Sequence, residues 1–189
     1  KENFKKVKIL EFGVDKGIST ALFLELCNKK NGKLYSVDTI DYSKHFTDKN
    51  WKFINCRDDD YMTINKIVDF PVDIIFLDTE HTAKHVEKIF FNYYKSLRKG
   101  GLFIIDDISW LPYLKNKKRD NEWIENNNKE TFFKIIDILN SNIKNITVEF
   151  SFQYSGLAII KKITNTLNKN TKTPSREYSL KNIIKKLIK

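Results

Sequence analysis

The sequence predicts a doubly wound α/β domain, in which helices cover both faces of a mostly parallel sheet. Short apolar runs alternate along the chain with segments of helical periodicity, which is the pattern of βαβ units. The run at residues 72–77 is almost continuously apolar, as expected for a strand that is covered on both faces. The 189 residues, of which 41% are hydrophobic, are enough for one domain with a sizeable core.

The elements follow from local patterns, taken in chain order. Strands are predicted where an apolar run ends at a turn residue or an acid: residues 7–12, 34–37, 51–55, 72–77 and 102–105. Helices are predicted where apolar residues recur every three or four positions: residues 19–27, 62–68, 86–97 and 132–139. Ser19 or Thr20 is expected near the N-cap of the first helix, and Gly100-Gly101 is expected to end the third. Residues 146–152 and 156–160 predict a terminal hairpin, and the polar residues 116–129 predict an inserted loop or short helix over the site.

The formal net charge of +10 is concentrated at the C-terminal end of the chain. Residues 161–189 carry nine Lys or Arg and one Glu, a net charge of +8, so residues 1–160 carry only +2. We therefore divide the chain into a domain at residues 1–162 and a tail at 163–189, a basic linker followed by an amphipathic helix. The apolar face of that helix is formed by Leu180, Ile183, Ile184, Leu187 and Ile188.

Several partners are compatible with this tail. A basic segment can hold RNA, an anionic membrane or an acidic partner, or it can be the solvated surface of a helix. The helix is too short to be stable alone, so we expect it to dock, and we favour protein, including a second subunit, over an anionic membrane. No apolar run approaches the ~20 residues that span a bilayer, and no leader peptide is expected. Cys27 and Cys56 are placed as in a reduced compartment, so we expect a cytoplasmic protein, with peripheral membrane contact through the tail as the alternative.

Two glycines follow the first predicted strand, in the segment Glu11-Phe12-Gly13-Val14-Asp15-Lys16-Gly17-Ile18-Ser19-Thr20. Ligands of open α/β sheets bind beyond the carboxyl ends of the strands, and glycine lets the main chain turn tightly against a ligand. The spacing is not G-x-G-x-x-G, and Glu11, two residues before the first glycine, would repel a phosphate. The acid suits a ligand with positive charge, such as the sulfonium and ammonium groups of S-adenosylmethionine. A tight turn without a ligand is the alternative.

A carboxylate, Asp38, ends the second predicted strand, about one βαβ step after the glycines. In dinucleotide-binding folds a carboxylate at this place accepts hydrogen bonds from the two ribose hydroxyls. Alone, Asp38 would be a surface acid after a strand. Together with the glycines it predicts a nucleoside site.

Three carboxylates and a histidine follow two strands that should be neighbours in the sheet. Asp78 and His81 come after the strand at 72–77, and Asp106-Asp107 after the strand at 102–105. Parallel neighbours lie about 4.8 Å apart, so the carboxylates can meet at one cation. Oxygen ligands without Cys or paired His favour Mg²⁺, Mn²⁺ or Ca²⁺. His81 could take the proton of a substrate hydroxyl held on that metal. The alternatives are a turn or helix cap for the aspartates and a helix N-terminal position for His81.

Together these segments resemble the class I S-adenosylmethionine-dependent methyltransferases. The resemblance covers residues 7–161 and rests on four motifs: Glu11-Phe12-Gly13-x-x-x-Gly17-x-Ser19-Thr20, Tyr35-Ser36-Val37-Asp38, Leu77-Asp78-x-x-His81 and Gly100-Gly101-Leu102-Phe103-Ile104-Ile105-Asp106-Asp107. More narrowly, they are similar to the metal-dependent sugar O-methyltransferases of the macrocin and mycinamicin type, and more distantly to catechol O-methyltransferase. The resemblance implies a Rossmann-like seven-stranded sheet, mostly parallel with an antiparallel last strand.

The resemblance also implies roles for individual residues. The implied cofactor contacts are Glu11, Gly13, Gly17, Ser19, Thr20, Asp38, Arg57, Asp58 and Asp78. The implied metal ligands are Asp78, Asp106 and Asp107, and the implied catalytic residues are Asp78 and the base His81. The chain departs from the family at Cys56-Arg57-Asp58, where Gly-Asp-Ser is frequent, and at Thr79, where Gly is frequent. Residues 113–128 have no counterpart in the family and are where acceptor choice is expected to lie.

The predicted function is methyl transfer from S-adenosylmethionine to a hydroxyl of a sugar, glycan or other small molecule. A divalent metal, Mg²⁺ first, would position the acceptor, and a homo-oligomer is compatible with the chain. One alternative is an RNA methyltransferase that uses the basic tail. The nearly neutral domain argues against it, so nucleic acid is not the expected partner. Another alternative is a catalytically inactive S-adenosylmethionine-binding scaffold.

Overall fold

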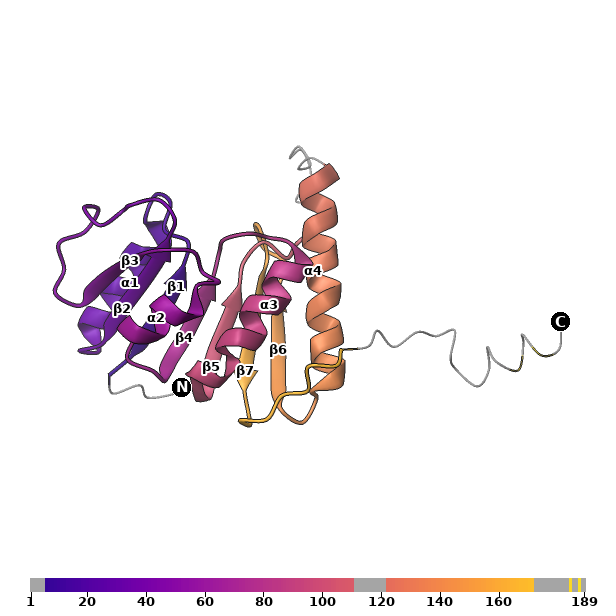
Figure 1. Cartoon of the computed structure of the whole chain (residues 1–189). Coiled ribbons are helices and arrows are strands. Elements are labelled where there is room, and N and C mark those ends of the chain that lie inside the picture. Colours follow the sequence, from indigo (N-terminus) through magenta and orange to yellow (C-terminus); the bar gives the residue numbers. More distant parts are fainter. Residues whose placement is uncertain (1–5, 111–121, 172–183, 185–186, 188–189) are drawn as a thin grey trace.

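A seven-stranded sheet forms the centre of the chain in a computed structural model that describes residues 6–110, 122–171, 184 and 187 (Figure 1). The strand order is β3-β2-β1-β4-β5-β7-β6. Strands β3, β2, β1, β4 and β5 pair in parallel, whereas β7 is antiparallel to both β5 and β6. The predicted fold class is therefore confirmed, including the antiparallel last strand.

Strands and helices alternate along the first two thirds of the chain, except that β3 follows β2 without a helix between them. The strands are β1 Lys8–Phe12, β2 Lys33–Asp38, β3 Trp51–Asn55, β4 Val72–Leu77, β5 Leu97–Ile105, β6 Ile146–Ser151 and β7 Leu157–Lys162. The helices are α1 Ile18–Lys29, α2 Tyr61–Ile67, α3 Ala83–Tyr93 and α4 Glu122–Ser141, with a 3-10 turn at Tyr94–Ser96 after α3.

Helices cover both faces of the sheet, as the doubly wound pattern predicted. Leu10 and Phe12 of β1 belong to an apolar cluster that includes residues of α2, α3 and α4. Ile9, which points the other way, belongs to a second cluster with Leu24 and Cys27 of α1. Every residue of β4 is buried, because both faces of this strand are covered. Figure 1 shows α4 at the end of the sheet opposite to β3.

Strand β5 begins at Leu97 rather than at the predicted residue 102. Helix α3 ends at Tyr93 and passes through the 3-10 turn directly into this strand. The glycine pair that was expected to end the helix lies inside β5, where Gly100 takes a positive φ of 79° and the pairing with β4 shifts register between Val72 and Ile74. A bulge of this kind interrupts the apolar pattern, and it hid the first part of the strand.

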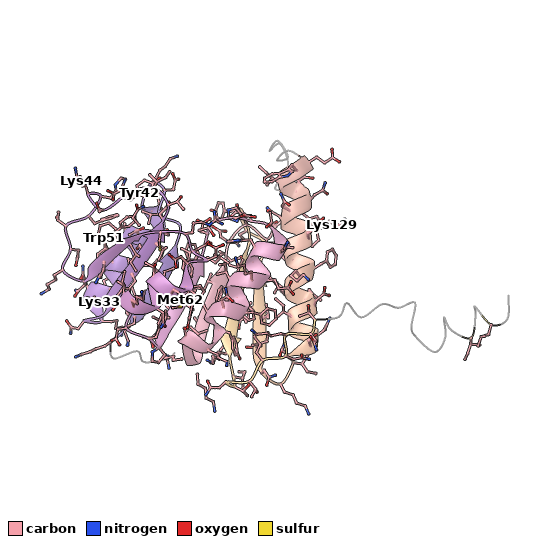
Figure 2. The ribbon with its side chains drawn as sticks, in the orientation of Figure 1. Lys33, Tyr42, Lys44, Trp51, Met62 and Lys129 are labelled. Carbon is pink, nitrogen blue, oxygen red and sulfur yellow. The ribbon has the colours of Figure 1, made fainter. Side chains whose placement is uncertain are left out.

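Helix α4 begins at Glu122, within the stretch expected to form an inserted loop or short helix. Its buried side chains recur at helical spacing, but the first two are polar: Asn128, Thr131, Ile135 and Ile138. Lys129, labelled in Figure 2, extends from this helix. The apolar pattern that starts at residue 132 therefore identified only the second half of α4. Residues 111–121 of the expected insertion lie outside the described residues.

The first part of the predicted tail contacts the domain. Leu167 packs against the larger apolar cluster, and the Asn168 backbone N–H donates to Asn142 Oδ1 at 2.7 Å. Most of the expected C-terminal helix lies outside the described residues. No helix among the described residues is long and apolar enough to cross a membrane.

Candidate functional site

A cavity of about 400 Å³ lies at the carboxyl ends of β1, β2, β3 and β4, where a nucleoside site was predicted. The loops after these four strands line it, together with His85 from the first turn of α3. Its lining is rich in acidic side chains: Asp15, Asp38, Asp58, Asp78 and Glu80. Among the described lining residues, Arg57 is the one side chain that carries a permanent positive charge. An excess of carboxylates favours a ligand that carries positive charge.

The glycines shape the turn between β1 and α1 as predicted. Gly13 and Gly17 have positive φ angles of 93° and 74°, which L-residues with a side chain rarely adopt. A Cβ atom on Gly13 would collide with the backbone carbonyl of Asp78. The Gly13 N–H donates to the Val37 carbonyl at 3.0 Å. The missing side chain at Gly13 therefore lets the loops after β1, β2 and β4 meet at one end of the cavity.

Glu11 is fully buried in a cluster of hydroxyl groups and does not line the cavity. Ser19 Oγ donates to its Oε1 at 2.6 Å, and Thr20 Oγ1 and Ser36 Oγ donate to its Oε2 at 2.9 and 2.6 Å. Trp51, labelled in Figure 2, donates from Nε1 to Ser36 Oγ at 2.9 Å. Burial raises the pKa of Glu11 although the three hydroxyl hydrogen bonds act to lower it. The cluster ties β1 to α1, β2 and β3.

The same hydrogen bonds explain why α1 begins differently from the prediction. Gly17 is the N-cap of α1 and makes no side-chain capping bond. The hydroxyls of Ser19 and Thr20, which were expected near the cap, are turned to Glu11 instead. None of these four residues lines the cavity, so a direct contact with a cofactor stays a prediction for each of them.

Asp38 lines the cavity at the end of β2, as predicted. Its Oδ2 accepts a hydrogen bond from the Val14 backbone N–H at 2.9 Å, and its Oδ1 accepts one from the Ile40 N–H at 3.0 Å. Each carboxylate oxygen can accept a further hydrogen bond. The backbone bonds thus hold the carboxylate in place while leaving it able to bind a diol.

A buried carboxylate–imidazole pair forms another part of the cavity wall. The side chains of Asp58 and His85 are each only 7% exposed, and His85 Nε2 lies 2.7 Å from Asp58 Oδ2. Thr79 Oγ1 donates to the same oxygen at 2.5 Å, and the Tyr93 hydroxyl donates to the Asp58 carbonyl at 2.8 Å. Asp58 was among the predicted cofactor contacts, whereas His85 was not predicted. A histidine in the first turn of the helix after β4 was the only available signal.

Arg57 lines the cavity from the loop after β3, beside Asp58. Its Nε donates to Asp59 Oδ1 at 3.0 Å, and Lys88 Nζ lies 2.9 Å from Asp59 Oδ2. Hydrogen bonds from Arg57 and Lys88 hold the pKa of Asp59 well below its usual range. A planar guanidinium can stack on the ring of a bound ligand.

Asp78, His81 and Asp107 approach one another at the carboxyl ends of β4 and β5. His81 Nε2 lies 3.6 Å from Asp78 Oδ1 and 3.3 Å from Asp107 Oδ2. Asp106 Oδ1 accepts hydrogen bonds from the Asp107 backbone N–H and from Ser155 Oγ, each at 2.7 Å. Asp107, the second residue after β5, takes a positive φ of 57°. Only Asp78 of this group also lines the cavity, so it joins the two parts of the site.

The donors near Asp78 have the chemistry that a hard divalent cation needs. Burial and the neighbouring charge of Asp106 raise the pKa of Asp78 to about 6; His81 acts to lower it and Asp107 to raise it. A divalent cation would relieve this repulsion among carboxylates, which are the ligands that Mg²⁺ prefers. Within residues 6–110 and 122–171, however, no group of three or more His, Cys, Asp or Glu side chains forms a metal site. The predicted metal site is therefore not confirmed.

A family model described as a methyltransferase domain matches residues 10–108 of the chain. This range includes the carboxyl ends of all the strands that line the cavity, together with Asp78, His81, Asp106 and Asp107. No curated protein matches the chain.

Several solved structures have a fold similar to that of this chain. MycE methyltransferase from the mycinamycin biosynthetic pathway, solved with Mg and SAH, is 23% identical with a TM-score of 0.62, covering 85% of this chain and 46% of MycE. SAH-bound PaMTH1 from Podospora anserina is 14% identical with a TM-score of 0.64, covering 83% of this chain and 72% of that one. Fibrillarin, a pre-rRNA processing protein of Methanococcus jannaschii, is 18% identical with a TM-score of 0.56, covering 86% of this chain and 70% of fibrillarin. At these identities the likeness shows the fold alone, and the chain spans about half the length of MycE.

Proposed function

Since the chain belongs to the class I methyltransferase domain family, we propose that it transfers a methyl group from S-adenosylmethionine to a hydroxyl group of a small molecule or glycan. The observation that carries the proposal is the continuity of the site. One acidic cavity suits a cationic nucleoside, and Asp78 connects it to a histidine and further carboxylates at the next strand end. A methyl donor and an acceptor hydroxyl would therefore lie side by side.

The cofactor half of the proposal rests on fixed acceptors along the cavity. Asp38 would accept hydrogen bonds from the ribose hydroxyls, since its carboxylate is already oriented by two backbone N–H groups. The ring face of Arg57 and the carboxylate of Asp58 would contact the adenine base. The surplus of carboxylates would favour the sulfonium and ammonium groups of the cofactor. The sulfonium is already activated, so the main task of the protein is to orient it.

The acceptor half rests on His81 and the three aspartates. Asp78, Asp106 and Asp107 would hold a divalent cation such as Mg²⁺, which when bound makes an acceptor hydroxyl more acidic. His81 would take the proton of that hydroxyl as it attacks the methyl group, because an imidazole is a suitable base near neutral pH. A structure of the similar protein MycE contains Mg, SAH and mycinamycin VI. This supports a metal and a small-molecule acceptor here.

Other partners follow from the sequence rather than from the site. We propose that the protein acts in the cytoplasm and that its tail docks on protein, either the domain itself or a second subunit, with peripheral contact to an anionic membrane as the alternative. The described residues favour neither the RNA-modifying alternative nor the inactive scaffold.

Isothermal titration calorimetry with S-adenosylmethionine, with and without Mg²⁺, tests the proposal. We expect binding by the parent protein and strongly reduced binding by Asp38→Ala. Methyl transfer to candidate sugar and glycan acceptors should then be followed by mass spectrometry, before and after EDTA. Absence of cofactor binding by the parent protein would refute the proposed function.

A further inference from the structure

The side-chain hydrogen bonds to the buried Asp58 carboxylate all reach the same one of its two oxygens, and the proposed reaction does not explain this. Both donors that reach the Asp58 carboxylate, His85 Nε2 and Thr79 Oγ1, meet it at Oδ2, at 2.7 and 2.5 Å. No described residue donates to the other oxygen, Oδ1. Because Asp58 lines the cavity, the unpaired oxygen is the one available to a ligand.

The pair also keeps Asp58 ionised. Burial acts to raise the pKa of Asp58, but the hydrogen bonds from His85 and Thr79 together outweigh it and hold the pKa below its usual value of 3.8. The hydrogen bond to Asp58 in turn raises the pKa of His85 above 6.5, against the effect of burial. Two further carboxylates also raise the pKa of His85: Glu80, whose Oε2 lies 3.7 Å from Nδ1, and Asp59, which is itself paired with Arg57 and Lys88. An ionised carboxylate only accepts hydrogen bonds.

We propose that His85 is a positioning residue which makes Asp58 select a 6-amino purine, adenine, over a 6-oxo purine. The inference rests on the proposed function, because it takes the cavity to hold the adenosine part of the cofactor. With the ribose on Asp38, the base extends toward the loop of Arg57 and Asp58. The exocyclic amine of adenine donates a hydrogen bond to Asp58 Oδ1, whereas a 6-oxo group at the same place would meet a second acceptor.

This arrangement explains why the selectivity depends on His85, which need not touch the ligand. Without the imidazole, Thr79 is the only described donor to Oδ2, and burial then favours a protonated and less strictly oriented Asp58. A protonated carboxyl group can donate as well as accept, so it tolerates a 6-oxo base. A site whose polar group hydrogen-bonds the correct ligand rejects an analogue that leaves this group of the site unpaired. The rejection is lost when protonation lets the group donate as well as accept.

The test compares two ligands by calorimetry: S-adenosylhomocysteine and its 6-oxo analogue, S-inosylhomocysteine. The parent protein should bind the adenosine ligand about tenfold or more tightly than the inosine ligand, as expected for one charge-assisted hydrogen bond. His85→Leu should bring the two affinities close together. His85→Gln, which keeps an N–H donor on a side chain of similar reach, should largely preserve the difference.

Val86→Ala is the matched control, because Val86 is a buried residue of the same helix that makes no bond to Asp58. Val86→Ala should lower thermal stability and leave the ratio of the two affinities unchanged. The His85 variants would behave in the same way if His85 had only a structural role. If His85→Leu does not fold, His85→Asn, whose amide is too short to reach Asp58, takes its place. This inference alone would be overturned if a folded His85→Leu or His85→Asn variant kept the affinity ratio of the parent protein. It would also be overturned if the parent protein bound both ligands equally. A parent protein that binds neither ligand would overturn the proposed function.

Discussion

Replacing Glu11 with alanine should destabilise the domain more than it weakens cofactor binding. The carboxylate is fully buried and accepts hydrogen bonds from Ser19, Thr20 and Ser36. It does not line the cavity, so its effect on a ligand is indirect. The change therefore separates the structural role seen in the fold from the cofactor contact that the sequence predicted.

The expected size of the effect follows from the burial of the three donors. Thr20 and Ser36 are fully buried, so their hydroxyls cannot turn to water when the carboxylate is removed. A buried hydroxyl without a partner costs about 1–3 kcal/mol, and the half-buried Ser19 should cost less. Removing a poorly solvated carboxylate offsets part of this. We expect the free energy of unfolding to fall by about 2–4 kcal/mol, or the melting temperature by roughly 5–15 °C.

Urea denaturation and calorimetry with S-adenosylhomocysteine measure the two effects separately. Glu25→Ala is the control, because Glu25 is an exposed acid whose ion pair among the described residues is with Lys29 on the same helix, and its loss should leave stability unchanged. An unchanged melting temperature for Glu11→Ala, combined with loss of cofactor affinity, would refute the reasoning. Glu11 would then be a direct cofactor contact.

The raised pKa of Glu11 adds a pH dependence of defined sign. A carboxyl group whose pKa is higher in the folded than in the unfolded state binds more protons when folded. Its contribution to stability therefore falls as the pH rises from about 4.5 through the folded pKa. Glu11→Gln removes this titration, so the stability advantage of the parent protein over Glu11→Gln should shrink with rising pH. A stability difference that stays constant as the pH rises from about 4.5 would contradict the raised pKa of this buried carboxylate.

Four further predictions concern the site and the tail. Asp38→Ala should weaken binding of S-adenosylmethionine by about 2–4 kcal/mol in calorimetry, and unchanged affinity would remove Asp38 from the site. Asp106→Asn combined with Asp107→Asn should abolish metal dependence while keeping cofactor affinity; activity of the parent protein that is insensitive to EDTA would refute the metal proposal. His81→Ala should lower turnover by roughly 10²–10⁴-fold with little effect on cofactor affinity, and an unchanged rate near neutral pH would make its role structural. Truncation after Lys162 should change thermal stability or oligomeric state, and tail-dependent, salt-sensitive sedimentation with anionic liposomes would favour a membrane instead.

The fold was predictable where one pattern dominated the sequence. The almost continuous apolar run of β4 and the alternation of short runs with helical spacing were enough to identify a doubly wound sheet. Boundaries were missed where tertiary contacts override the pattern. The bulge at Gly100 hides the start of β5, and Asn128 and Thr131 give α4 a buried face that is polar at its beginning.

The site was predictable to the extent that position at a strand end determines it. Asp38 is the last residue of β2 and Asp78 directly follows β4, and both line the cavity. Glu11 lies inside β1, and only the fold reveals that its carboxylate turns beneath the loop toward three hydroxyls. His85 was missed because its partner Asp58 is 27 residues earlier in the sequence, on a loop whose course no local pattern specifies.

The backbone around Asp78 links the cofactor and acceptor halves of the site. The Asp78 N–H donates to the Phe12 carbonyl at 2.9 Å, and its own carbonyl lies so close to Gly13 that a Cβ atom there would collide with it. The turn that shapes the cavity and the strand end that presents Asp78 are therefore held against each other. Since transfer between a donor and an acceptor depends on their relative placement, this contact would align the methyl group with the acceptor oxygen. A side chain at Gly13 would consequently disturb both halves at once, although Gly13 lies only in the cofactor loop.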